Sequence, residues 1–207
     1  MNRLINSVKS TTLKTSLGRK LQEKHGSRSR LIKSDASQIK GTKLNLACGN
    51  LHIPGYVNVD SSDKCEPDLV SKIQDVALNF DPESISNITM IHGLGYISYD
   101  EAISFFRDAF NLLKPGCELI IETPSLNKIA KQIVSSDFDL TVTPQLIFPI
   151  FATSNSGPTH GDCYQFAWTQ TLLGAELLQA GFKSVRAEAP LTHGQKLDRD
   201  MRIIAIK

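Results

Sequence analysis

The chain of 207 residues has ordinary fractions of hydrophobic (41%) and charged (21%) residues, which fit one globular domain with a short extension. No apolar run reaches the roughly 18 residues of a membrane-spanning helix, and no apolar segment of a secretory signal follows the first basic residues. The four cysteines are scattered without a CxxC pair, so they predict neither a disulfide framework nor a zinc site, and we expect a cytoplasmic protein.

Residues 1–40 form a basic N-terminal arm, which we expect to be a helix followed by a linker. The arm holds ten Lys or Arg and two acidic residues, a net charge of +8, whereas the remainder carries −6. Leu4, Val8, Leu17 and Leu21 lie near helical spacing, and residues 26–40 are rich in Ser, Arg and Lys. Such an arm could pack on the body, contact an anionic membrane surface or a partner protein, or act as a transit peptide. It has no interleaved aromatic residues, which argues against nucleic acid as a partner.

Residues 41–207 read as one domain in which short apolar runs alternate with helical segments. Strands are expected at 43–47, 56–60, 69–73, 88–92, 118–123, 184–188 and 202–206. One helix should begin at Ser98, where Glu101 completes a capping box, and a second should run from Thr169 to Ala180. Strands separated by helices predict an α/β, Rossmann-like fold, a mostly parallel seven-stranded sheet with helices on both faces. Residues 141–168 break the alternation and are expected to form a long loop near the active edge.

The first two predicted strands carry the pattern of a nucleoside site. The first ends in a tight turn at Gly49, where a ligand can lie against the backbone, and the second ends at Asp60. In an open parallel sheet, ligands bind beyond the carboxyl ends of the strands. A carboxylate there can accept hydrogen bonds from both hydroxyls of a ribose. The segment after the first strand lacks the GxGxxG pattern of a dinucleotide-binding oxidoreductase.

Four blocks of the sequence resemble class I S-adenosylmethionine (SAM)-dependent methyltransferases. The opening motif is matched by LNLACGN at 44–50 with GYVNVD at 55–60. The segment 88–97 is similar to the fourth strand and the following turn, 112–124 to the fifth-strand signature, and 177–182 to the approach to the last strands. The resemblance covers residues 43–207, and it is closest to small methyltransferases associated with surface-glycan biosynthesis.

The resemblance implies SAM as the cofactor. In the family, the glycine turn passes the methionine moiety, the acid holds the ribose, and a region after the third strand contacts the adenine. The residues that we expect to bind SAM are Asn45, Ala47, Cys48, Gly49 and Asn50, then Asp60 and Ser61, then Asp75 and Val76, and finally His92.

Some positions depart from the family pattern. Asn45 and Ala47 stand where an acid and a glycine are usual, and Gly95 and Tyr96 replace Glu and His. Only about eight residues join the first two strands, although a parallel crossover normally includes a helix. The alternative hypothesis is therefore a non-catalytic binding or partner module with a degenerate cofactor pocket.

Methyl transfer from a sulfonium is a direct displacement, so the protein mainly aligns the acceptor and excludes water. A base is needed only where the acceptor loses a proton, as a hydroxyl does. The candidates are His160, which Asp162 could orient, and His92 at a strand end. The sequence predicts methyl transfer to a hydroxyl of a small molecule, such as a sugar or glycan precursor, with no metal.

Overall fold

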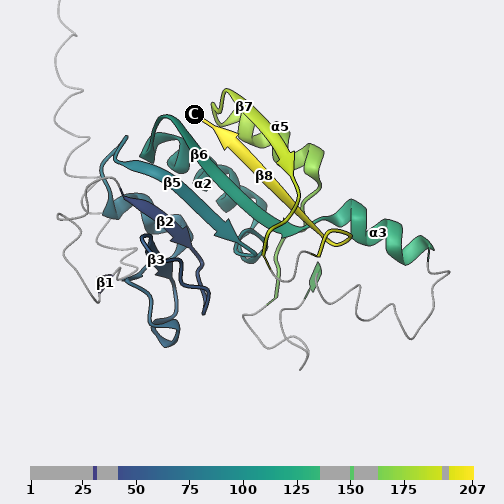
Figure 1. The fold of residues 1–207 in the computed structure, drawn as a ribbon, viewed down its shortest axis with the longest axis horizontal. Coiled ribbons are helices and arrows are strands. Elements are labelled where there is room, and N and C mark those ends of the chain that lie inside the picture. Colours follow the sequence, from purple (N-terminus) through teal and green to yellow (C-terminus); the bar gives the residue numbers. More distant parts are fainter. Residues whose placement is uncertain (1–29, 32–41, 136–149, 152–162, 193–195) are drawn as a thin grey trace, which may run out of the picture.

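The computed structural model of the chain describes residues 30–31, 42–135, 150–151, 163–192 and 196–207. Among these residues, eight strands form one sheet in the order β1-β4-β3-β2-β5-β6-β8-β7 (Figure 1). The strands are β1 (Arg30–Leu31), β2 (Lys43–Leu46), β3 (Val57–Asp60), β4 (Leu69–Val70), β5 (Ile85–Ile91), β6 (Leu113–Pro124), β7 (Ser184–Glu188) and β8 (Asp200–Ile206). The helices are α2 (Tyr99–Leu112), α3 (Leu126–Ser135) and α5 (Gln170–Gln179), with short 3-10 helices η2 (Asp63–Cys65), η3 (Ile73–Asn79) and η4 (Leu94–Tyr96).

All seven predicted strands are present, and β1 is an addition that the sequence did not predict. It comes from the expected linker of the basic arm and pairs antiparallel with β4, so residues before 41 extend the sheet at one edge. The rest of the arm lies outside the described residues. The third predicted strand is shorter than expected, because after Val70 the chain turns into η3.

The sheet is mixed, so the predicted parallel arrangement is confirmed for five strands and not for the rest of the sheet. Strands β4, β3, β2, β5 and β6 run parallel, whereas β8 lies antiparallel between β6 and β7. The physical reason is the connection between β7 and β8. It consists of residues 189–199 and contains no crossover helix in its described part, so the chain returns in the opposite direction.

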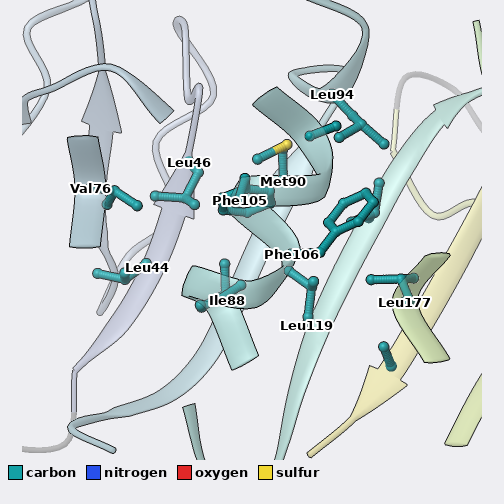
Figure 2. Packing of buried hydrophobic residues seen from close by; sticks show 14 of the residues in the cluster. Leu44, Leu46, Val76, Ile88, Met90, Leu94, Phe105, Phe106, Leu119 and Leu177 are labelled. Carbon is teal, nitrogen blue, oxygen red and sulfur yellow. The ribbon is translucent and has the colours of Figure 1, made fainter. Parts of the chain in front are cut away.

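The described helices that pack on the sheet cover one face of it. Alternate residues of the strands meet η3, α2 and α5 in a single apolar core, drawn in Figure 2. Phe105 and Phe106 of α2 are fully buried there, between Leu46 and Leu119 of the sheet and Leu177 of α5. Figure 1 shows α2 and α5 behind the sheet and α3 beyond its end. The opposite face has no described helix on it, so helices on both faces are not found in the described part of the chain.

Helix α2 begins as predicted. The Ser98 side chain accepts a hydrogen bond from the Glu101 amide, and Glu101 Oε2 accepts one from the Ser98 amide at 2.8 Å, which is a complete capping box. In the part of the chain that the structure describes, no helix is long and apolar enough to cross a membrane.

Candidate functional site

The carboxyl ends of the parallel strands bring most of the predicted site residues to one edge of the sheet. Gly49 follows β2, Asp60 ends β3, and His92 follows β5. Because β8 is antiparallel, its first residue, Asp200, lies at the same edge and pairs with Pro124 at the end of β6. This edge is where open α/β sheets bind ligands.

The turn after β2 has an unusual backbone. Ala47 and Gly49 have φ values of 51° and 48°, in the left-handed region that favours glycine. The turn keeps this conformation with alanine at position 47, at a cost of about 1–2 kcal/mol. The Ala47 methyl group lies over Gly93, where an added Cβ would approach it to 2.6 Å. A Cβ added at Gly49 would have no heavy atom within 4 Å, so this turn faces open space.

The Asp60 carboxylate holds this turn in place. Its Oδ2 accepts a hydrogen bond from the Gly49 amide at 2.9 Å, and its Oδ1 accepts one from the Ser62 amide at 2.9 Å. An ionised carboxylate has about four acceptor positions, so each oxygen retains one. A half-buried carboxylate with one acceptor position on each oxygen suits a vicinal diol. Ser61, next in sequence, is exposed.

Three polar side chains fasten the short connection between β2 and β3. The Asn45 amide donates to Leu51 O at 2.6 Å and to Asn58 Oδ1 at 2.9 Å, and Asn58 Oδ1 also accepts from the Ile53 amide at 2.8 Å. Asp68 Oδ2 accepts from the backbone and side-chain nitrogens of Asn58. The Asn45 side chain is 1% exposed, and its amide group bonds to the connection at Leu51. Its cofactor role stays a prediction.

The other predicted cofactor residues have different environments. Val76 is fully buried in the core beside Leu44 and Leu46 (Figure 2), so only its backbone could reach a ligand. Asp75 is half-buried on η3, and Asn50 is exposed. Burial, with a smaller contribution from the Asp60 charge, raises the pKa of the Cys48 thiol to about 12. Cys48 is therefore a neutral thiol at pH 7 and no nucleophile.

His92 forms a charged cluster with two residues at the start of β8. His92 Nε2 lies 3.1 Å from Asp200 Oδ2, and Arg199 donates to both oxygens of Asp200, at 2.5 and 2.6 Å. Asp200 is 1% exposed. Burial alone would raise the pKa of its carboxyl group, but the hydrogen bonds from His92 and Arg199 outweigh burial and lower it to about 2. His92 has a φ of 57°, so its backbone is also left-handed. Asp200 and Arg199 lie more than 100 residues from His92 in the chain, and no local pattern in the sequence marks them.

Tyr164 occupies the space created by the departure at Gly95. An added Cβ at Gly95 would lie 2.7 Å from the Tyr164 ring, and the Tyr164 and Tyr96 rings meet edge to face at 4.9 Å. The Tyr164 hydroxyl donates to the His92 carbonyl at 3.3 Å. Burial raises the pKa of Tyr164, so the hydroxyl remains protonated. This tyrosine, which the sequence did not single out, forms a wall of the site beside His92.

Glu122 anchors the segment that follows β7 next to the cluster. Its carboxylate accepts from the Leu191 amide at 2.9 Å, from Thr192 and from Arg202 at 2.5 Å. Although burial opposes ionisation, these hydrogen bonds lower the pKa of Glu122. The predicted residues His160 and Asp162 lie outside the described residues, so their roles remain predictions.

The sequence matches no protein-family model and no curated protein. The structure is similar to a SAM-dependent methyltransferase from Methanosarcina mazei, with a TM-score of 0.56 and 19% identity over 83% of this chain and 95% of that one. It is also similar to one from Archaeoglobus fulgidus, with a TM-score of 0.54 and 13% identity over 92% and 93% of the two chains.

The fold is that of SAM-dependent methyltransferases. A Thermotoga maritima protein described as a SAM-dependent methyltransferase and possible histamine N-methyltransferase shares it, with a TM-score of 0.52 and 12% identity over 82% of this chain and 83% of that one. At these identities the likeness shows the fold alone. The resemblance seen in the sequence is thus confirmed for the fold.

Proposed function

We propose that this chain is a SAM-dependent methyltransferase that acts on a hydroxyl group of a small molecule, such as a sugar or glycan precursor. The observation that carries the proposal is the meeting, at one sheet edge, of a nucleoside-type site and a hydrogen-bonded histidine–aspartate pair. The shared fold with proteins described as SAM-dependent methyltransferases supports it.

The residues at the β2 and β3 ends fit SAM. Gly49 leaves open space beside the Asp60 carboxylate, whose remaining acceptor positions would hold the ribose hydroxyls. The Asp75 region would contact the adenine, through the backbone at Val76. When bound, SAM supplies a methyl group already activated on its sulfonium. The protein then needs to align an acceptor and exclude water.

His92 is the described residue best placed to take the proton that a hydroxyl acceptor loses. Its Nε2 bonds to Asp200. When the neutral ring carries its proton on Nε2, the lone pair that can accept a second proton is on Nδ1. Asp200 orients the ring through this hydrogen bond. Arg199, on the same carboxylate, keeps Asp200 ionised. His160 remains the second candidate base.

The first test is calorimetric titration of the full chain with SAM and with S-adenosylhomocysteine. Saturable one-to-one binding is expected. Asp60→Ala removes a charged acceptor and should weaken SAM binding by about 1.5–3 kcal/mol, which is roughly tenfold to more than a hundredfold. Asp63→Ala, three residues away on the exposed η2, is the matched control and should bind normally.

Equal affinity of the two aspartate variants would refute the placement of the ribose. No binding to the unaltered chain would favour the non-catalytic module. Once binding is established, hydroxylated acceptors, sugars first, can be screened by S-adenosylhomocysteine release. His92→Gln should then slow transfer at saturating SAM, and an unaltered rate would remove His92 from the mechanism.

A further inference from the structure

Strand β7 forms an open edge of the sheet. It is the last strand in the sheet order, and no described element pairs with its outer side, whereas the opposite edge strand is β1 (Figure 1). Among the described residues, no strand bonds to its backbone N–H and C=O groups on that side, so these groups can pair with another strand. Arg186, Ala187 and Glu188 are all exposed.

The side chains of β7 alternate between two chemically different faces. Arg186 and Glu188 lie on the face away from α5, where Arg186 donates to Glu188 at 2.9 Å and to Glu118 of β6 at 3.3 Å. Val185 and Ala187 lie on the α5 side, as the period of two in a strand requires. A strand added at this edge would therefore meet charged side chains on one face of β7 and apolar side chains on the other.

An apolar groove runs between α5 and the α5-facing side of β7. It has a volume of about 350 Å³, and small residues, Gly174 and Ala175, form part of its α5 wall. Leu178, also in the lining, has 51% of its surface exposed. Leu178, the groove and the outer side of β7 thus lie together on one surface.

We propose that two copies of this chain pair through β7, antiparallel, about a two-fold axis at Ala187. In an antiparallel pair, the side chains of two opposed residues lie on the same face of the sheet. Opposed residues of two identical strands therefore differ by an even number of positions, so the two-fold axis passes between two copies of one residue. An axis at Arg186 would set the two arginines against each other, which destabilises a strand pair. An axis at Ala187 sets Arg186 opposite Glu188 of the second copy, twice, and Ala187 opposite Ala187.

The charge pattern thus selects one register. On the α5 side, the same register places Val185 opposite Ala189 of the second copy, and Leu178 and the groove become covered. The sheet then continues from one copy into the other. In this register only residues 186–188 of each β7 oppose β7 of the other copy, so the contact is small and we expect a dissociation constant on the order of micromolar.

The test is a charge exchange followed by sedimentation velocity over a series of protein concentrations. Arg186→Glu and Glu188→Arg should each weaken the dimer by roughly tenfold or more, because each sets like charges opposite each other twice. The chain with both substitutions should dimerise again. An equimolar mixture of the two single variants should form a mixed dimer, since both opposite-charge pairs are then restored.

Arg107→Glu is the matched control, because Arg107 is exposed on α2 and the charge change is the same. It should leave the dimer unchanged, and circular dichroism with thermal melting should show that all variants are folded. A monomer at every concentration would overturn the proposal. So would a dimer that Arg186→Glu leaves intact, or failure of the double variant and of the mixture to restore it.

Discussion

Gly95 lies against the ring of Tyr164, and this contact explains how the chain tolerates a departure from the methyltransferase pattern. No side chain fits at position 95 while Tyr164 occupies its place, because an added Cβ would come within 2.7–2.9 Å of three ring atoms. The Gly95 carbonyl also accepts a hydrogen bond from the Gln165 amide at 2.7 Å. A tyrosine from a distant segment thus fills the volume beside Gly95 that a side chain at this position would need.

At the scale of this residue pair we predict strong coupling. Gly95→Ala should lower the free energy of unfolding by about 1–3 kcal/mol, because the ring must shift within a packed site. In a Tyr164→Ala background the same substitution should cost almost nothing. Urea denaturation of the four chains gives the coupling free energy. Additive effects would show that the ring does not lie against Gly95.

The connection between β2 and β3 shows how side chains replace a secondary-structure element. Parallel strands normally need a crossover helix, whose amino end supplies free amides to a ligand. Here residues 47–56 make the connection. Asn45 and Asn58 bond its backbone to the sheet, and Asp68 holds the Asn58 side chain. The Gly49 turn is therefore positioned by buried amide side chains and by Asp60.

Asn58→Ala tests this element. Removal of the side chain leaves the Ile53 amide without its acceptor and takes one of two acceptors from the Asn45 side chain, so the free energy of unfolding should fall by about 1–3 kcal/mol. SAM affinity should fall as well, since the turn loses its support. Asn87→Ala, at a half-buried asparagine in β5, serves as control for both measurements. If Asn58→Ala loses stability but keeps its SAM affinity, the hydrogen bonds of Asn58 support the fold and do not position the cofactor site.

Across the whole molecule, closure of the sheet places the buried Asp200 carboxylate between His92 and Arg199. The pKa of Asp200 is lowered from 3.8 to about 2 in the folded state. A carboxyl group with a depressed folded pKa stabilises the fold fully above its unfolded pKa, and this contribution is lost as the pH falls through the folded value.

We therefore expect Asp200 to contribute on the order of 2 kcal/mol to stability above pH 4, and to lose this contribution between about pH 4 and pH 2. Asp200→Asn should be less stable than the parent near neutral pH, and the difference should narrow through that acid range. Denaturation at several pH values measures it. A difference that is constant from pH 5 to pH 2 would contradict the hydrogen-bonded, ionised state of Asp200.

Local pattern was sufficient where the determining contacts are close in sequence. The capping box at Ser98 and Glu101 satisfies backbone amides of its own helix, so it was readable. The seven strands followed from apolar runs, and the sheet edge carrying Gly49, Asp60 and His92 followed from the rule that ligands meet strand ends. The sequence also shows no helical pattern between 188 and 202. This pattern favours an antiparallel β8, which the prediction did not include.

What only the tertiary structure decided depends on residues far apart in the chain. The antiparallel course of β8 brings Asp200 and Arg199 to His92 across more than 100 residues, and nothing in their neighbourhoods signals this. Tyr164 reaches Gly95 in the same way, and Arg30–Leu31 leaves the expected linker to pair with β4. The sequence by itself determined the elements and the edge, because propensity, periodicity and capping are local. Which residues contact one another within the site could be known only from the fold, because these residues are close in space and not in sequence.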